Sequence, residues 1–298
     1  YNFQYAEFLD LQPGTYTFGY ASTSGLSANW TPAGSAISQG KFTITADGGI
    51  IVPGTATDIA GAGTEYDASK LGDSVNPVFT GGTLVANEND KTYSNDFTLD
   101  SSATNTLDAN GNNNTFTGEF SDANSAQAGK ITFADSSSGG DGTVILTGKN
   151  THTGGTTVTS GTLAVSGNGT LGAESGTTTI NGGTLELGGT SQTQQALVQS
   201  SGTVQNGTVN VDDYTLSGGT LASTAVINAT DAISVSAGQV DGVLNGAAEL
   251  TKTGSGTVTL TNANGYTGGT TMNAGTLAVS GNGTLGAESG TTTINGGT

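Results

Sequence analysis

The chain contains no cysteine and no arginine, and its 298 residues include only six lysines against 24 acidic residues. The absence of cysteine excludes disulfide bonds, thiolate metal ligands and cysteine nucleophiles. The net charge is −18, and a phosphate backbone is bound mainly through Lys and Arg. We therefore predict no binding to nucleic acid, and the same charge would repel an anionic membrane surface.

Long apolar runs and helical apolar stripes are also missing. Hydrophobic residues make up 33% of the chain, and no run approaches the length that crosses a membrane. Large aliphatic residues stand singly or in pairs between Thr, Ser and Asn, as in 162–165 and 184–187. Gly, Ser and Thr are also common in disordered chains, but these aliphatics recur regularly. The pattern predicts an all-β protein of short strands, each with one buried side.

Aromatic residues and prolines are scarce after the first part of the chain. The prolines lie between Pro13 and Pro77, Trp30 is the single tryptophan, and Tyr214 and Tyr266 are the only aromatics after Phe133. We therefore divide the chain into three regions, each defined by its composition. These regions are an aromatic N-terminal cap or small β region (1–75), a transition of irregular first coils (76–150) and regular Gly/Thr-rich coils (151–298).

Region 1–75 shows strand patterns without a repeat. Residues 15–20 alternate so that Tyr16, Phe18 and Tyr20 share one face of a strand. Residues 41–45 and 50–52 predict further strands, separated by a turn at 47–49 and ended by Pro53. Such a region suits the cap that hides the end of a solenoid, and a separate small β domain is the alternative. In region 76–150 we predict strands at 83–85, 97–99, 115–117, 131–133 and 144–146.

The last region is built on an internal repeat. Residues 161–184 and 275–298 are identical letter for letter, at an offset of 114 residues. A fixed internal period indicates an array of stacked units. The tripeptide Gly-Gly-Thr and the dipeptide Asn-Gly recur every six to ten residues. We expect a corner at each of them, because Gly accepts the positive φ of tight turns.

Short strands that turn without reversing form a coil, and we expect three strands and about 18–24 residues in each coil. One coil alone buries too little apolar surface to offset the entropy of ordering it, so stability requires neighbouring coils. Parallel crossovers are nearly always right-handed. The sequence therefore predicts a right-handed parallel β-helix, or β-solenoid, with strands about 4.8 Å apart.

Both ends of the sequence suggest a longer natural protein. The chain starts at Tyr1 without a leader, which suggests a processed product. Thr184 is followed by a strand pattern at 185–187, whereas the second copy stops at Thr298. We therefore expect the natural protein to continue past Thr298.

One motif occurs in both copies of the repeat. It reads Asn-Gly-Tyr-Thr-Gly-Gly-Thr-Thr at 264–271 and Ala-Gly-Thr-Leu at 274–277. The first copy has the same pattern at 150–157 and 160–163, with His152 in the position of Tyr266. This motif resembles the passenger-associated transport repeat, which is typical of type V autotransporter passengers of Gram-negative bacteria.

The resemblance implies a secreted passenger at the cell surface, anchored to the outer membrane by a C-terminal β-barrel outside this sequence. In that family the repeat is associated with secretion and folding of the passenger. The resemblance covers each motif and the compatible Gly/Thr coils, but not residues 1–75. It is specific for exported β-helices and not for any one activity.

Few residues suggest a catalytic or metal-binding site. His152 is the only histidine, so a triad or a histidine zinc site would have to use it. Its counterpart Tyr266 indicates that the position takes any planar, half-polar side chain, and we predict a structural role. A glycan-cleaving site would need clustered acids, and the candidate is Asp212 with Asp213 beside Tyr214, which we predict to be a turn.

Metal and phosphate sites find equally little support. The run 108–112 (Asp-Ala-Asn-Gly-Asn) starts like a calcium loop, but its glycine is misplaced for an EF-hand. Weak surface binding of Ca²⁺ through Asp135 or Asp141 is the alternative to a solvated acidic turn. The Gly-Asn-Gly runs at 167–169 and 281–283 lack the strand–helix context of a phosphate loop, and we predict corners there.

We therefore predict a non-enzymatic surface passenger without catalytic, cofactor-binding or metal-binding residues and without a cofactor. It would act as an adhesin or stalk in cell-surface or cell–cell attachment, with a host or neighbouring cell surface, or a second copy, as its partner. The alternative is a structural subunit of an extracellular filament or surface layer assembled by β-helix stacking. A polysaccharide-processing enzyme is a third, disfavoured interpretation.

Overall fold

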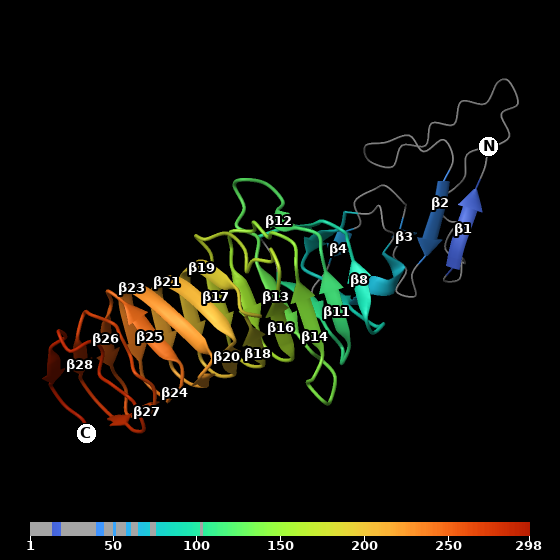
Figure 1. The fold of residues 1–298 in the computed structure, drawn as a ribbon. Helices are drawn as coiled ribbons and strands as arrows, with labels where there is room; N and C mark the ends of the chain where they lie inside the picture. The colour runs from blue at the N-terminus through green and yellow to red at the C-terminus, as the bar shows by residue number, and fades with distance from the viewer. Residues whose placement is uncertain are drawn as a thin grey trace, which may run out of the picture.

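The computed structural model describes residues 14–18, 40–44, 50–51, 58–60, 65–71, 76–101 and 104–298. Its described elements are β-strands, apart from the short 3-10 helix η2 (Ala68–Lys70). The strands stack side by side along one axis, and the C-terminus lies at one end of the stack (Figure 1). The predicted all-β parallel solenoid is confirmed.

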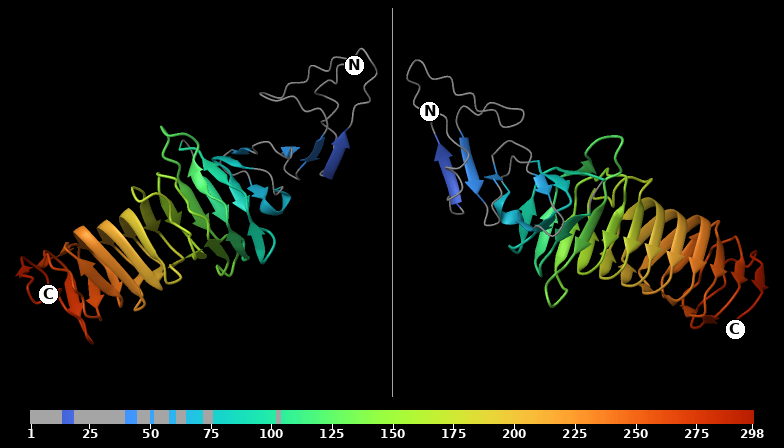
Figure 2. Two further views of the ribbon diagram at one scale, coloured as in Figure 1. Left: turned by 45° about the horizontal axis from the view of Figure 1, so that its top comes forward. Right: turned by 180° about the vertical axis from the view of Figure 1, so that it is seen from behind.

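The largest sheet, called the long sheet below, contains 13 strands, and its neighbouring strands are parallel. Figure 2 shows its strands crossing the stack one after another. They are β5 (Glu65–Asp67), β7 (Thr83–Val85), β10 (Asn105–Asp108), β13 (Ile131–Ala134), β15 (Thr156–Val158), β17 (Thr177–Ile180), β19 (Ser191–Gln199), β21 (Gly207–Leu216), β23 (Ala225–Val235), β25 (Val243–Gly246), β26 (Glu249–Lys252), β28 (Thr270–Met272) and β30 (Thr292–Ile294).

The second sheet contains 10 parallel strands and closes the other side of the coils. They are β8 (Lys91–Tyr93), β11 (Asn113–Phe116), β14 (Thr143–Leu146), β16 (Thr162–Val165), β18 (Thr184–Glu186), β20 (Thr203–Gln205), β22 (Thr220–Leu221), β24 (Gly238–Val240), β27 (Thr257–Leu260) and β29 (Thr276–Val279).

Two smaller sheets complete the described part of the chain. The third sheet is parallel and contains β4 (Asp58–Ala60), β6 (Val78–Thr80), β9 (Phe97–Leu99) and β12 (Phe120–Asp122). The N-terminal sheet is antiparallel and contains β1 (Gly14–Phe18), β2 (Gly40–Ile44) and β3 (Ile50–Ile51).

Region 1–75 therefore contributes to two kinds of sheet. The strands predicted from 15, 41 and 50 correspond to β1, β2 and β3. β4 and β5 pair with solenoid strands, so the parallel sheets start before residue 76. Tyr20, the turn at 47–49 and Pro53 lie outside the described residues, and the capping role of the region stays a prediction.

The core is made of ladders in which one inward side chain stacks on the equivalent residue of the next coil. One such ladder follows the long sheet through Phe133, Val158, Ile180 and Gln199, and all four residues are buried. Because each coil covers the apolar residues of its neighbours, burial is shared along the stack, which is why a single coil would not be stable.

Aromatic residues fill the first coils. Phe97 stacks on Phe120 with ring centroids 4.7 Å apart, and Tyr93 stacks on Phe116 at 4.9 Å. Each pair also consists of register partners on neighbouring strands. After Phe133 the core consists mainly of smaller aliphatic residues, and this change follows the end of the third sheet.

Coil length follows the number of corners. Register partners are 26 positions apart from Leu107 to Phe133 and 17 apart from Val235 to Lys252. The shorter coils contain strands of 9, 10 and 11 residues, namely β19, β21 and β23. These strands have no internal glycine and run straight through a corner, so the prediction of three short strands per coil is wrong for this part.

Candidate functional site

The first repeat motif places His152 in the core of its coil, where the residue is 1% exposed. The ring atom Nε2 lies 3.0 Å from Oγ1 of Thr156, and that hydroxyl donates to the carbonyl oxygen of Leu171 at 2.8 Å. The other ring nitrogen, Nδ1, lies 3.3 Å from the carbonyl oxygen of Phe120. The side chain therefore joins its own coil to the coils before and after it.

The second motif reproduces this relay with a phenol. The hydroxyl of Tyr266 lies 2.7 Å from Oγ1 of Thr270, and Thr270 donates to the carbonyl oxygen of Leu285 at 3.1 Å. Tyr266 is completely buried. The predicted equivalence of His152 and Tyr266 thus extends to their hydrogen-bond partners.

An asparagine and a threonine form a second contact between coils that occurs in both motifs. The backbone N–H of Asn150 donates to Oγ1 of Thr170 at 2.8 Å, and this hydroxyl donates to the backbone carbonyl oxygen of Asn150 at 2.8 Å. Asn264 and Thr284 make the same pair of bonds at 2.7 and 2.9 Å. The asparagine Oδ1 also accepts a backbone N–H of the preceding coil in both copies. These contacts fix the stacking of three successive coils.

An imidazole beside a hydroxyl is also the arrangement of a base and a nucleophile. Here Thr156 is 1% exposed, like His152, and its hydroxyl proton is directed to Leu171. Burial lowers the pKa of His152, more than the Phe120 carbonyl and the Asp122 charge raise it, so the ring is neutral near pH 7. The geometry holds coils together and leaves a substrate no access to the pair.

The structure separates the residues of the glycan-cleaving candidate. Asp212, Asp213 and Tyr214 lie in β21, so the predicted turn is wrong, because the strand continues where a corner would need glycine. Asp212 and Asp213 are exposed, and Asp212 accepts a bond from Thr230 at 3.3 Å. Tyr214 points the other way, is fully buried and donates to Gln199 at 2.9 Å. The acids and the phenol cannot act on one substrate.

The acidic loops of the calcium candidate bind backbone amides. Asp135 Oδ1 accepts the N–H groups of Gly111 at 2.8 Å and Ser137 at 3.0 Å, and Oδ2 accepts that of Gly142 at 2.7 Å. Burial alone would raise the pKa of Asp135, but a hydrogen bond from the Ser137 side chain and these backbone bonds outweigh it and lower the pKa. Asp108 likewise accepts two backbone N–H groups. In the part of the chain that the structure describes, no cluster of three potential ligands could hold a metal ion.

The Gly-Asn-Gly runs at 167–169 and 281–283 form turns, as predicted. In the first turn Gly169 donates to Ser166 at 3.0 Å, and in the second Gly283 donates to Ser280 at 2.9 Å. Gly167 and Gly281 both have a φ of 61°. The positions are corners of the solenoid, and no helix follows them.

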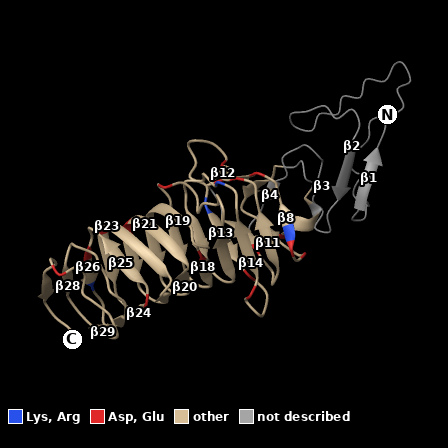
Figure 3. Ribbon diagram, viewed as in Figure 1, with Lys and Arg blue, Asp and Glu red and all other residues tan. Residues whose placement is uncertain are grey.

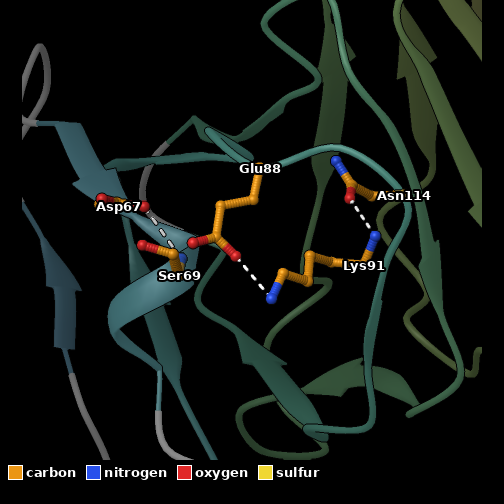
Figure 4. Close-up of polar contacts among 5 residues, drawn as sticks. All are labelled: Asp67, Ser69, Glu88, Lys91 and Asn114. Carbon is orange, nitrogen blue, oxygen red and sulfur yellow. Dashed lines mark hydrogen bonds and ion pairs between the residues drawn. The ribbon is translucent and has the colours of Figure 1, made fainter.

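Polar contacts also organise the first coils (Figure 4). The ammonium of Lys91 and the carboxylate of Glu88 are 2.7 Å apart, and the side chains of both are half-exposed. The backbone N–H of Lys91 donates to Asn114 at 2.9 Å, and Asp67 caps η2 by accepting the N–H of Ser69 at 2.9 Å. An open cavity of about 180 Å³ lies beside these residues. Because its two opposite charges are already paired, the cavity offers no net charge to a ligand.

Two polar residues, Lys252 and Gln199, are buried in the ladders, and no sequence motif marks them as core residues. Lys252 is completely buried, and its ammonium donates to the carbonyls of Thr253, Gly254 and Ala274 at 2.6, 3.0 and 3.1 Å. Burial lowers its pKa. Gln199 lies in the same ladder, with Lys252 three register steps further on. Both side chains satisfy backbone carbonyls at a corner, and neither is accessible to a ligand.

The outer surface is polar, and its charges lie mainly at corners and loops (Figure 3). One outward row of the long sheet, called the threonine row below, carries no charged residue from β13 to β30, although the chain has a net charge of −18. Before β13 the same register runs through Thr106 and Thr83 to Glu65. The neighbouring outward row of this sheet carries exposed Asp213 and Glu249. The corresponding row of the second sheet passes close to Glu186 and Asp241, which are both partly buried. The threonine row consists of Thr132, Thr157, Thr179, Val198, Thr215, Ser234, Thr251, Thr271 and Thr293.

The motif units match a known family model. The model described as passenger-associated-transport-repeat matches residues 139–165 and 250–279, which contain His152 and Tyr266. The chain carries autotransporter passenger repeats. The resemblance inferred from the two motifs is thereby confirmed, and the buried relays described above belong to these repeats.

A curated relative supports the same assignment. The chain is 37% identical over 93 residues to the adhesin BmaC autotransporter of Brucella suis biovar 1 (strain 1330), and the match covers 29% of this chain and 3% of that protein. The chain therefore corresponds to a small part of this relative. No solved structure matches the chain. None of the helical residues in the described ranges forms a segment with the length and apolarity of a membrane-crossing helix.

Proposed function

We propose that the chain is part of a surface passenger that acts as an adhesin or stalk in cell-surface or cell–cell attachment. The observation that carries this proposal is a continuous β-solenoid containing two passenger-associated transport repeats. Similarity to a protein named as an adhesin adds support. A C-terminal outer-membrane barrel elsewhere in the full protein would hold the passenger at the cell surface.

The threonine row is the surface that we assign to attachment. Between Thr132 and Thr293 the row itself presents no like charge to a cell surface or to a second acidic chain, although the chain has a net charge of −18 and the neighbouring row carries two exposed acids. Its side chains recur once per coil, so weak contacts would add along the shaft by multivalency. Nothing in this arrangement requires an enzymatic activity.

Attachment can be tested with the chain displayed on a bacterium through a heterologous outer-membrane barrel. We expect displayed cells to bind host cells or one another, and Thr157→Glu with Thr179→Glu to reduce binding at least tenfold. Thr162→Glu with Thr184→Glu is the matched control, because these residues occupy an equivalent outward row on the second sheet. Equal losses in both double variants would assign attachment elsewhere, and no binding by the parent chain would refute the proposal.

The identical copies 161–184 and 275–298 favour a second candidate, a structural element lengthened by duplication. Such a subunit would polymerise by stacking coils end to end. Negative-stain microscopy of the purified chain distinguishes the two functions, because filaments without cell binding would favour the structural subunit.

A further inference from the structure

The two repeat motifs contain the same buried relay with different acid–base chemistry. An imidazole gains a proton near pH 6.5, whereas a phenol stays neutral up to about pH 10. His152 is the only histidine of the chain, and Tyr266 occupies its position in the second copy. Mild acid can therefore change the charge of the first relay and not of the second.

The first relay has no good place for a second ring proton. The carbonyl oxygen of Phe120, which faces Nδ1, already accepts the backbone N–H groups of Thr151 at 2.9 Å and His152 at 3.1 Å. A carbonyl has two lone pairs, so a third donor at 3.3 Å would be poorly bonded. His152 is only 1% exposed, so bulk water does not solvate a second proton on the closed ring.

The charged groups around the relay are few and mostly engaged. On the preceding coil, Asp122 accepts bonds from Gly129 and Thr153, and Glu119 accepts one from Thr151. Lys149 lies on the same loop as His152, and Glu174 follows the contact loop of the next coil. The charge of Asp122 favours the protonated ring, but its effect is smaller than the effect of burial.

We propose that His152 makes the first motif an acid-labile joint of the solenoid. In mildly acidic solution the coil around 150–173 opens more readily, while the coil around 264–287 stays closed. Opening exposes the imidazole to water, where it binds a proton that the closed coil holds badly. The first motif thus becomes the place at which the N-terminal coils separate from the rest of the shaft.

Proton binding determines the direction in which pH shifts the equilibrium between the closed and the open coil. The folded-state pKa of His152 is lowered, so below about pH 6.5 the open coil binds more protons than the closed coil. The equilibrium for opening then rises by up to tenfold per pH unit until the closed coil also titrates. Between pH 7.5 and 5.0 the limit is about 30-fold, and ordinary carboxylates stay ionised over this range.

Hydrogen exchange followed by mass spectrometry tests the joint at pH 7.5 and 5.0, after correction for intrinsic exchange rates. Peptides covering 147–160 and 261–274 report the two motifs, and they differ in sequence, unlike 161–184 and 275–298. We expect protection of the first peptide to fall more than threefold at pH 5.0, with little change in the second peptide.

Exchanging the two ring types provides the decisive comparison. His152→Tyr should remove the acid response of the first peptide, and Tyr266→His should create one in the second peptide. Each variant is first shown to be folded at pH 7.5 by circular dichroism, and the two substitutions test the same relay independently. Equal acid responses of both motifs in the parent chain, an unchanged response in His152→Tyr, or no transfer in Tyr266→His would overturn the proposal.

Discussion

The side-chain oxygen of Gln199 accepts a hydrogen bond of 2.9 Å from the hydroxyl of Tyr214 on the next coil. Both residues are fully buried. The Gln199 amide nitrogen donates to the carbonyls of Gly202 at 3.1 Å and Thr220 at 2.9 Å. A polar residue in an apolar ladder is thus fully bonded, and it ties a corner of its own coil to the next coil.

This network predicts unequal effects for its two partners. Tyr214→Phe leaves one amide oxygen without a donor, which we expect to cost about 1–3 kcal/mol of unfolding free energy. Gln199→Leu leaves the Tyr214 hydroxyl without its acceptor and removes a donor from two carbonyls, of which that of Gly202 keeps its bond from the Thr220 N–H, and should cost more. Urea denaturation followed by circular dichroism measures both. A larger loss in Tyr214→Phe than in Gln199→Leu would contradict the network as described.

Lys252 offers a test of bonding against packing. Lys252→Met keeps most of the volume but removes the donors for three carbonyls, and we expect a loss of about 1–3 kcal/mol in unfolding free energy. Lys252→Ala also opens a cavity and should lose about 2–5 kcal/mol. The comparison uses urea denaturation at pH 7. If Lys252→Met were as stable as the parent chain, the desolvation of the buried ammonium would cancel its three bonds.

The architecture could be predicted from the sequence because its cause is periodic. Gly-Gly-Thr corners and single aliphatics recur at coil spacing, so the parallel solenoid follows from residues such as Val158 and Ile180, whose alternation with Thr fixes the buried face. The equivalence of His152 and Tyr266 follows from the 114-residue offset. These inferences use only the order of residue types.

The buried polar network and the long strands could not be predicted, because they depend on contacts between coils that no local sequence pattern encodes. Lys252 and Gln199 have polar side chains at core positions, and only the register shows the carbonyls that accept their bonds. Tyr214 looked like part of a turn because two acids precede it, but β21 runs through that corner. Tertiary pairing with β19 and β23 overrides the turn propensity of the acids.

Asp135 should act as a structural carboxylate. Its pKa is lowered, so its stabilisation is present above about pH 3.9 and lost as the pH falls below that value. Asp135→Asn turns an amide donor toward Gly142 N–H, and we expect a loss of about 1–3 kcal/mol at pH 7. Millimolar Ca²⁺ should leave the unfolding midpoint of the parent chain unchanged. A calcium-dependent increase that Asp135→Asn abolishes would show instead that the loop binds the ion.

Tyr266 predicts an alkaline limit for the second motif. Burial raises the pKa of Tyr266 to about 12, against a smaller opposing effect of the bond with Thr270. The unfolded chain ionises near pH 10, so stability is complete below pH 10 and falls by about 1.4 kcal/mol per unit until the folded-state pKa is reached. The difference between Tyr266→Phe and the parent chain should therefore shift in favour of Tyr266→Phe between pH 10 and 12. A constant difference across this range would contradict the effect.

Alanine substitutions at two glycines with positive φ distinguish the cost of steric crowding from the cost of backbone strain. Gly155 has a φ of 97°, and a Cβ there would lie 2.3 Å from the carbonyl oxygen of Thr177 on the next coil. Gly167 has a φ of 61°, and a Cβ there would meet nothing within 4 Å. Gly167→Ala should cost only the left-handed strain of about 1–2 kcal/mol. Gly155→Ala adds a clash that two adjacent coils must separate to relieve, so its urea midpoint should fall well below that of Gly167→Ala, and equal midpoints would mean that the coils are not held together at this corner.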